Sequence, residues 1–245
     1  MASDLEANVA ALASRHLLPR DSTPRLLALL EQLESDSGAP TGVRDPAAAV
    51  NVHLADSLVA LEVDAVREAR VVADLGAGAG FPGLPLAIAL PDALVSLLES
   101  TGHKAQFIER AAAAARIENA RAVPMRAEEW SEGLGACDVT CARALGRLDV
   151  VLEYAAPLLR LGGTAVAWKG RREAGEEHAG ATAAEELGLE AGPVLEVRPW
   201  PAAENRHLYL YRKVRPTPEG FPRRPGRARK RPLGGPPMPR RAPDL

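Results

Sequence analysis

The sequence is poor in aromatic residues and cysteine, and it contains no long apolar segment. Aromatic residues make up 4% of the 245 residues, so the core must be built from the abundant Ala, Val and Leu. No apolar run approaches the ~20 residues that cross a bilayer, and the first ten residues lack the basic start and apolar block of a secretory signal. Two cysteines, Cys137 and Cys141, form neither a disulfide framework nor a zinc-binding pattern. We therefore expect a cytoplasmic protein with no membrane segment and no metal site, long enough to bury a full core.

The formal net charge of −2 conceals an uneven distribution of charge. Residues 212–245 contain eleven Lys or Arg and two acids, a net of +9, whereas the other 211 residues carry a net of −11. An acidic body with a basic tail indicates a polyanionic partner. The same 34 residues include nine Pro and four Gly, a composition that buries too little apolar surface to offset the entropy of ordering. We predict that residues 215–245 are disordered in the free protein.

Before the tail, the hydrophobic pattern divides the chain into two parts. Residues 1–65 carry Leu and Val at helical spacing and predict an N-terminal helical cap. In residues 66–214, short apolar runs alternate with longer helical segments, which is typical of βαβ units and a parallel sheet. The predicted strands are 70–74, 93–98, 122–125, 137–142, 164–168, 194–197 and 207–211, and the predicted helices are 84–90, 103–118, 150–159 and 176–187.

Two further details follow from the spacing of these elements. No long helix separates the last two predicted strands, so that pair should be antiparallel. Gly162 and Gly163 follow the predicted helix 150–159 and are expected to end it.

The strongest local signal follows the first predicted strand, where Asp74 precedes a turn that reads LGAGAGFPG. Gly76, Gly78 and Gly80 permit a tight turn that a nucleoside can approach closely. In an open α/β sheet such a turn lies at the carboxyl edge, where ligands bind. A tight turn without a ligand is the weaker alternative, because three glycines alternate directly behind an acid. The sequence therefore predicts a nucleoside cofactor site.

The turn does not fit the dinucleotide fingerprint G-x-G-x-x-G. Counted from the first glycine, Phe81 occupies the third glycine position. Counted from the second, Pro82 stands where the helix should donate amides to a diphosphate. The Asp74 carboxylate suits a cationic amino-acid group better than a diphosphate, and Glu99 ends the second strand, where it can accept from ribose hydroxyls. These features favour S-adenosylmethionine over NAD.

Several short motifs extend beyond the turn in a fixed order. They are TGVRD from Thr41, HLADSL from His53, DLGAGAGFPGLPLAIALP from Asp74, ES from Glu99 with Lys104, RAEE from Arg126, ARA from Ala142, KG from Lys169, and FPRRPG from Phe221 with Lys230. In this order they resemble the bacterial small-subunit ribosomal RNA guanine-N7 methyltransferases, also called the glucose-inhibited division protein B family. The resemblance covers residues 41–231. The glycine turn alone is generic to methyltransferases, whereas the DSL element and the FPG extension are more specific.

The resemblance implies a class I (Rossmann-like) S-adenosylmethionine-dependent methyltransferase fold. This is an α/β fold with a mostly parallel sheet, an antiparallel last strand and, here, an N-terminal helical extension. The resemblance also implies a cofactor pocket that agrees with the predicted strand ends. Together with Asp74 and Gly78 from the turn itself, the predicted cofactor-binding residues are Gly76, Phe81, Glu99, Ser100, Thr101, Ala127, Glu128 and Arg143.

The implied reaction transfers a methyl group to N7 of one guanine in 16S ribosomal RNA. Guanine N7 presents a lone pair and carries no proton at neutral pH, so the transfer requires no general base. Rate should come from holding the acceptor and the methyl group close and in line. We therefore predict no catalytic residue that removes a proton.

Basic side chains are the candidates for RNA contact, because phosphate contacts supply affinity without reading sequence. They are His53, Lys169 and the tail residues Arg223, Arg224, Arg227, Arg229, Lys230 and Arg231. Each has a plainer alternative: His53 with Asp56 as a hydrogen-bonded surface pair, Lys169 without a phosphate partner, and the tail as a solvated segment. Cys141 is expected to be a core thiol rather than a nucleophile.

Three other functions stay open at this point. A methyltransferase acting on another RNA or on a small molecule keeps the pocket but leaves the basic tail unexplained. An NAD-dependent oxidoreductase is disfavoured by the turn, and a non-catalytic RNA-binding module leaves the cofactor pocket without a use. We expect a monomer whose partner is 16S rRNA or the small ribosomal subunit.

Overall fold

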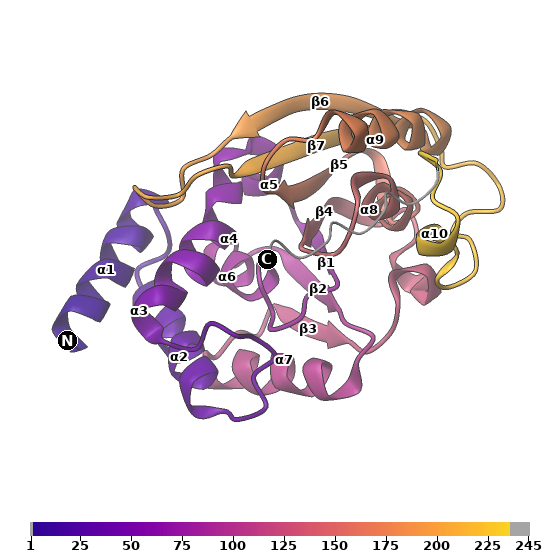
Figure 1. The fold of residues 1–245 in the computed structure, drawn as a ribbon. Helices are drawn as coiled ribbons and strands as arrows, with labels where there is room; N and C mark the ends of the chain where they lie inside the picture. The colour runs from indigo at the N-terminus through magenta and orange to yellow at the C-terminus, as the bar shows by residue number, and fades with distance from the viewer. Residues whose placement is uncertain (1, 236–245) are drawn as a thin grey trace, which may run out of the picture.

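The computed structural model describes residues 2–235, and these form one seven-stranded sheet with helices on both faces (Figure 1). The strand order is β3-β2-β1-β4-β5-β7-β6. The strands are β1 (Val71–Leu75), β2 (Leu94–Leu98), β3 (Ala120–Val123), β4 (Cys137–Arg143), β5 (Leu159–Lys169), β6 (Leu189–Glu196) and β7 (His207–Lys213). All seven predicted strands are therefore present.

The first five strands are parallel, and β7 is inserted between β5 and β6, antiparallel to both. The pairing follows from the connections. Helices join the parallel strands, whereas the ten residues between β6 and β7 contain no helix and allow only a reversal. The predicted sheet, mostly parallel with antiparallel pairing at its end, is confirmed.

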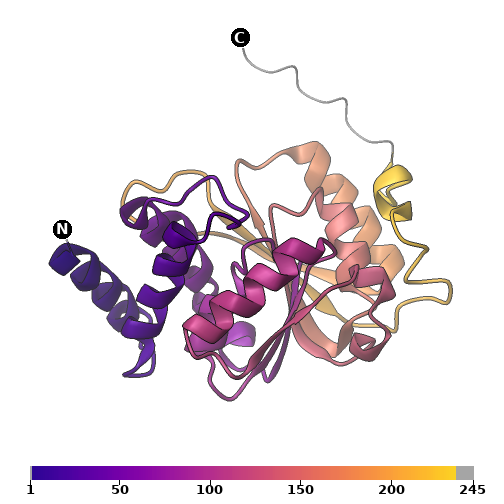
Figure 2. The same ribbon diagram turned by 90° about the horizontal axis from the view of Figure 1, so that it is seen from below.

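Two apolar layers lie on opposite faces of the sheet because successive strand residues point to opposite sides. On one face, Val72 and Val95 pack under α6 (Gly83–Ala89) and α7 (Gly102–Ala114). On the other, Ala73 and Leu98 pack under α8 (Leu148–Ala155) and α9 (Ala174–Leu187). Figure 2 shows these layers edge-on, with the N-terminal helices extending the α6/α7 side. Among the described residues, no helix combines the length and apolar character that crossing a membrane requires.

The N-terminal segment is helical, as predicted, but between residues 46 and 62 the type of helix changes three times. It comprises α1 (Ala2–Arg15), α2 (Ser22–Ser35), α3 (Pro46–Ala49), the π-helix η1 (Val50–Ala55), α4 (Asp56–Leu58), the 3-10 helix η2 (Val59–Glu62) and α5 (Asp64–Arg67). Leu26, Leu30 and Leu54 are fully buried in the same core as α6 and α7. The helical cap therefore shares the core of the sheet domain.

Local backbone geometry explains where predicted boundaries are wrong. Gly162 and Gly163 do not end a helix: they lie inside β5, beside the register shift of β4. A Cβ at Gly163 would lie 2.9 Å from the carbonyl oxygens of Cys137 and Asp138, so the close approach of the two strands requires glycine. Helix α7 ends at Ala114 rather than at residue 118, because Arg116 adopts a left-handed conformation with φ of 52°.

The predicted disorder of the tail is wrong for residues 215–235. This segment runs back over α8 and α9 and ends in the short helix α10 (Arg227–Lys230), at the right of Figure 1. Ala228 is 1% exposed in the second apolar layer, and Arg223 pairs with the buried Glu153 of α8. The amino-acid composition of the tail could not predict these two contacts, because each depends on residues that are distant in the chain. Residues 236–245 lie outside the described residues.

We predict that Gly83→Ala destabilises the protein. A Cβ at this position would lie 2.6 Å from a methyl carbon of the buried Leu97 and 2.8 Å from a carboxylate oxygen of Asp74. The expected loss is about 1–3 kcal/mol in the free energy of unfolding, measured by urea titration. The control is Gly102→Ala, at the start of α7, where a Cβ meets nothing within 4 Å. A Gly83→Ala variant as stable as this control would contradict the packing described.

Candidate functional site

A cavity of about 480 Å³ opens at the carboxyl ends of the parallel strands. Its wall is built by the ends of β1, β2 and β4, and by the loop after β3 that contains the 3-10 helix η3 (Ala127–Glu129). The N-terminal segment adds Thr41 and His53, and the C-terminal side adds Tyr154 of α8 and Arg229 of α10. The site therefore draws on distant parts of the chain. This is the edge at which open α/β sheets bind ligands.

The glycine turn forms one side of the cavity. Gly76, Gly78 and Gly80 have φ angles of 68°, 58° and 88°, values that favour glycine. A Cβ at Gly76 would also lie 2.5 Å from a methyl carbon of Leu145 across the cavity. The turn thus presents backbone rather than side chains to a ligand, as the sequence predicts.

Asp74 does not line this cavity, which corrects its predicted contact with the cofactor. The residue is 1% exposed, and its Oδ2 accepts a hydrogen bond of 2.8 Å from the amide of Gly83 at the start of α6. Its other oxygen has no hydrogen-bond partner among the described residues. Burial raises the pKa of this carboxyl to about 7. Asp74 therefore stabilises the glycine turn through its hydrogen bond to Gly83, on the side of the turn away from the cavity.

Glu99 ends β2 and faces the cavity from below the turn. Its Oε1 accepts from the amide of Thr101 at 2.8 Å, and its Oε2 accepts from the amide of Gly78 at 3.1 Å. These bonds fix the carboxylate at 7% exposure, with Ser100 and Thr101 beside it in the wall. Each carboxylate oxygen has a second lone pair, so Glu99 can still accept from a ligand hydroxyl.

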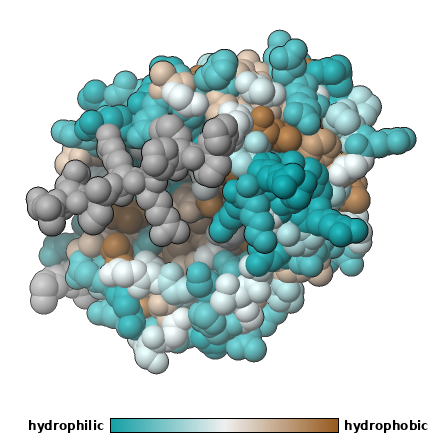
Figure 3. All heavy atoms as spheres, turned by 45° about the vertical axis from the view of Figure 1, so that its right-hand side comes forward, coloured by the Kyte–Doolittle hydropathy of each residue, from teal (hydrophilic) through white to brown (hydrophobic). Residues whose placement is uncertain are grey.

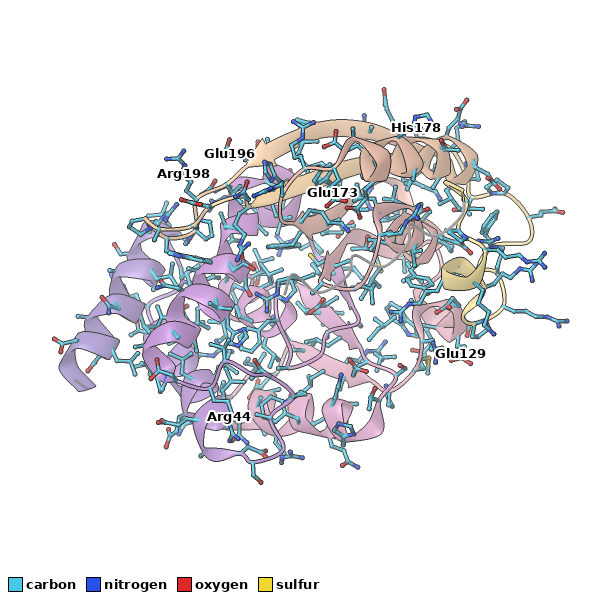
Figure 4. All side chains as sticks on the ribbon, viewed as in Figure 1. Arg44, Glu129, Glu173, His178, Glu196 and Arg198 are labelled. Carbon is cyan, nitrogen blue, oxygen red and sulfur yellow. The ribbon has the colours of Figure 1, made fainter. Side chains whose placement is uncertain are left out.

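The loop after β3 forms the opposite wall. Met125, Arg126, Ala127 and Glu128 all line the cavity. The side chain of Glu129 turns back to accept from the amide of Arg126, which closes η3 as a capping box. Figure 4 labels Glu129 just below α10. A hydrogen bond within the loop therefore stabilises this wall. The wall presents the apolar Met125 and Ala127 beside the charged Glu128.

Arg143, at the end of β4, joins the sheet to the N-terminal segment. Its Nη1 donates to the carbonyl of Val52 at 2.8 Å and to the carboxylate of Asp56 at 3.0 Å. Its guanidinium also lies 5.9 Å from the centre of the Phe81 ring. Val52 lies in the π-helix η1 and Asp56 directly follows it, and π-helical turns occur frequently at functional sites.

His53 is a buried residue of the cavity wall, so its alternative as a surface pair is wrong, whereas its contact with RNA stays a prediction. Its ring stacks on Phe81 with centroids 4.7 Å apart, and the residue is 6% exposed. Burial, followed by the charge of Arg143, lowers the pKa of His53 to about 4. Arg143 can only donate, so Nδ1 is an acceptor and the proton lies on Nε2, which faces the carbonyl of Val43 at 3.2 Å. His53 therefore sets the position of Phe81.

Lys169 is bonded to other residues of the protein, and both cysteines are buried in its core. The Lys169 ammonium pairs with Glu176 of α9 and donates to the carbonyl of Gly146, and its contact with a phosphate stays a prediction. Cys141 is fully buried, and burial raises the pKa of its thiol well above the ordinary value. Cys137 is equally buried, and burial raises its pKa to about 12. Both are core thiols.

The basic tail residues divide into two groups. Arg223 forms a two-pronged pair with Glu153, and Arg229 lines the cavity and donates to the carbonyl of Leu145 at 3.2 Å. The remaining ones are exposed at the surface: Arg224, Arg227, Lys230 and Arg231. Figure 3 shows a compact group of strongly hydrophilic side chains on the side of the molecule that carries α10.

The structure brings nine of the ten predicted cofactor residues into one wall: Gly76, Gly78, Phe81, Glu99, Ser100, Thr101, Ala127, Glu128 and Arg143. Sequence reasoning did not assign Met125, Tyr154 or Arg229 to the pocket. Met125 could have been found, since it lies two residues from the predicted Ala127. Tyr154 and Arg229 could not, because their helices reach the cavity through tertiary packing. Among residues 2–235, no group of His, Cys, Asp and Glu side chains is arranged to hold a metal ion.

The sheet order and the glycine-turn cavity define the class I methyltransferase fold. A solved structure titled as a mutant of MtNAS in complex with S-adenosylmethionine superposes with a TM-score of 0.52 and 14% sequence identity. The match covers 78% of this chain and 72% of that one, and at this identity it shows the fold alone.

The family follows from closer relatives. The family model described as rRNA small subunit methyltransferase G matches residues 25–205. A curated protein named ribosomal RNA small subunit methyltransferase G from Rubrobacter xylanophilus is 40% identical over 200 residues, covering 79% of this chain and 77% of the relative. One of the same name from Chloroflexus aggregans is 39% identical over 196 residues, covering 79% and 82%. The chain belongs to the rRNA small subunit methyltransferase G family.

The buried Asp74 predicts a pH dependence of stability. Its pKa in the folded protein, about 7, lies above the ordinary value, so the folded state binds this proton more tightly. The contribution of Asp74 to stability should therefore be greatest at low pH and be lost as the pH rises through 7. Because the lowered pKa of His53 acts in the opposite direction, this contribution is read from the difference between the wild type and a variant that lacks the carboxyl. Between pH 5 and pH 7 this contribution falls by about 1.4 kcal/mol per pH unit, about 3 kcal/mol in all, and it levels off above pH 7 because Asp74 is then ionised in both states.

Urea unfolding across this range checks the dependence. Asp74→Asn keeps an oxygen for the Gly83 amide but cannot ionise, so its stability should fall less than that of the wild type. The exposed Asp64→Asn is the control. Equal slopes for wild type and Asp74→Asn would show that Asp74 does not take up the proton.

Proposed function

We propose that this protein transfers a methyl group from S-adenosylmethionine to N7 of a guanine in 16S rRNA. One observation carries the proposal: the glycine turn, Glu99 and Ala127–Glu128 share the wall of one cavity, at the carboxyl edge of the sheet. Membership of the rRNA small subunit methyltransferase G family supports the choice of substrate and acceptor atom.

The cavity residues fit S-adenosylmethionine. Glu99 would accept hydrogen bonds from the vicinal ribose hydroxyls, since each of its oxygens keeps a free lone pair. Met125 and Ala127 would lie against the adenine ring. Within the glycine turn, a Cβ at Gly78 would meet only the carbonyl oxygen of Gly76 at 3.9 Å, so the turn leaves room there for the amino-acid portion. A volume of about 480 Å³ is within the range of small-molecule sites.

The same geometry disfavours a dinucleotide. The amide of Gly83, at the start of α6, already donates to Asp74, and the amide of Leu84 donates to the carbonyl of Gly80. These donors are therefore not available to a diphosphate. An NAD-dependent oxidoreductase would need them, so this alternative loses support.

In the proposed reaction, the protein has to bind and orient the cofactor and the guanine, and it does not have to transfer a proton. S-adenosylmethionine supplies a methyl group on a sulfonium centre, and guanine N7 supplies a lone pair without a proton. The two glutamates and the histidine of the wall are engaged by the protein: Glu99 by two amides, Glu128 by the amide of Gly226, and His53 by Val43 and Arg143. This arrangement suits an acceptor that needs no general base. Phe81, held by His53, and Arg143 would shape the space for the guanine.

The rim of the cavity supports contact with RNA. Lys104, Arg126 and Arg229 line its mouth, and Arg224, Arg227 and Lys230 continue the positive charge along the outside of α10. Such side chains bind phosphates and orient the nucleic acid without reading bases. The substrate guanine must be unstacked to enter. We expect a cytoplasmic monomer that acts on 16S rRNA or on the small ribosomal subunit.

The first prediction of this proposal concerns the cofactor. Calorimetric titration should give saturable binding of S-adenosylmethionine and no binding of NADH. Glu99→Ala should weaken that binding by about 10–100-fold, because a hydrogen bond to a charged group contributes about 1.5–3 kcal/mol. The matched control is Glu196→Ala, an exposed glutamate at the end of β6 that is not part of the cavity wall and that Figure 4 labels far from Glu129 of η3.

Two outcomes would contradict the cofactor assignment. They are binding of NADH alone, and equal loss of binding in the Glu99→Ala and Glu196→Ala variants. If S-adenosylmethionine binds, incubation with small subunits lacking the modification, followed by chemical cleavage at 7-methylguanine and primer extension, locates the methylated base. A single new cleavage site in 16S rRNA is the expected result.

The second prediction concerns the outside of α10. The triple variant Arg224→Ala/Arg227→Ala/Lys230→Ala should bind a 16S rRNA fragment more weakly at low salt. The slope of log affinity against log salt should become shallower by about 2, since each lost phosphate contact removes about 0.7–0.9. The control is Arg212→Ala, an exposed arginine on β7 near the amino ends of the parallel strands. An unchanged slope in the triple variant would place the RNA elsewhere.

A further inference from the structure

Residues 221–231, which we call the C-terminal strap, approach the cavity from outside the sheet. The strap follows β7, crosses α8 and ends in α10, which packs on α8. Figure 4 labels Glu129, the last residue of η3, just below the yellow helix α10. Most strap residues are half-buried or exposed, so a small number of contacts holds it in place.

The first of these contacts is the pair between Arg223 and Glu153. The Arg223 Nε donates to one carboxylate oxygen of Glu153 at 2.6 Å, and its Nη2 donates to the other. The same Nη2 donates to the carbonyl of Arg231 at 2.9 Å, which folds the strap back on itself. Glu153 is 2% exposed. A buried carboxylate requires such a partner, so the pair specifies where the strap lies.

The second contact reaches the cavity wall. The amide of Gly226 donates to Oε1 of Glu128 at 2.9 Å, and Gly226 can do so because its φ of 77° turns the chain into α10. Glu128 lines the cavity beside Ala127. The strap therefore holds one oxygen of a residue that a bound nucleoside would also meet.

The third contact places a cation at the mouth of the cavity. Ala228 is 1% exposed and anchors α10, and the next residue, Arg229, lies beside Tyr154 and donates to the carbonyl of Leu145. Tyr154, Leu145 and Arg229 all belong to the cavity wall. Without the docked strap, Arg229 would be missing from the wall beside Tyr154 and Leu145, and Glu128 would lose its amide partner.

We infer that the C-terminal strap completes the proposed cofactor site, with Arg223 as a positioning residue that acts through Glu128 and Arg229. This inference rests on the proposed binding of S-adenosylmethionine. Docking of the strap and binding of the ligand then stabilise each other, because thermodynamic coupling between two sites is reciprocal. Arg223 does not line the cavity, so its effect on the ligand has to pass through the strap.

The test compares Arg223→Ala with Arg212→Ala, which removes an exposed arginine on β7 near the amino ends of the parallel strands, away from the cavity. Calorimetry with S-adenosylmethionine should give a Kd about tenfold weaker for Arg223→Ala and unchanged for Arg212→Ala. Arg223→Lys retains the charge but not the two-pronged geometry, and it should recover part of the affinity.

Arg223→Ala leaves a buried carboxylate without its partner and could fail to fold. The double variant Arg223→Ala/Glu153→Leu removes both charges and avoids that cost. It still lacks the anchor, so it should show the same weakened binding. Its thermal unfolding midpoint without ligand confirms that it is folded.

Proteolysis of the wild type provides a second test, because the rate of cleavage in the strap would not depend on the ligand if the strap had only a structural role. Trypsin cleavage at Arg227, Arg229 and Lys230, followed by mass spectrometry, should slow about tenfold when S-adenosylmethionine is saturating. Cleavage that is equally fast with and without bound ligand would overturn the inference, as would wild-type affinity in a folded double variant. A wild type that binds no S-adenosylmethionine would instead contradict the proposed function and, with it, this inference.

Discussion

A buried hydrogen bond from the amide of Gly83 to the carboxyl of Asp74 holds the end of β1 to the start of α6. Between these two residues the chain must reverse in a few steps, which it does through three glycines with positive φ. The bond is possible only because Gly83 has no side chain, since a Cβ would collide with Asp74 and Leu97. The turn in turn exposes backbone to the cavity and places the Gly78 amide on Glu99. The shape of the cavity at the ends of β1 and β2 therefore depends on the buried hydrogen bond between Gly83 and Asp74.

Two buried ion pairs then attach the ends of the chain to this frame. Arg143 of β4 binds Asp56 of the N-terminal segment, and Arg223 of the strap binds Glu153 of α8. Burying a charge without its partner is costly, whereas a satisfied pair adds little net stability. Such pairs act chiefly by specifying position. One fixes the π-helical turn that holds His53 against Phe81, and the other fixes the strap beside η3. The cavity is complete only when both are made.

Much of this architecture could be predicted from local pattern. The alternation of apolar residues located β1 and β2, and the glycine turn with Glu99 located the cofactor edge of the sheet. What could not be predicted depends on partners distant in the chain. Nothing near His53 indicates that Phe81 covers its ring, and nothing near Lys169 indicates its pairing with Glu176. Asp74 was assigned to the ligand because strand-end carboxylates face the cavity by default, yet the turn folds over it.

The charge asymmetry of the sequence has two physical consequences rather than one. The basic tail is ordered because the acidic body offers Glu153 and Glu128 as partners, so part of its charge binds the protein itself. The cations that remain on the outside of α10 are fewer than the composition implies, but their positions are fixed. A fixed set of charges beside a cavity can orient a polyanion, whereas a disordered tail can only attract it. In the proposed function, the same segment would bind RNA on its outer side while completing the cofactor wall on its inner side, and each role would favour the ordered state on which the other depends.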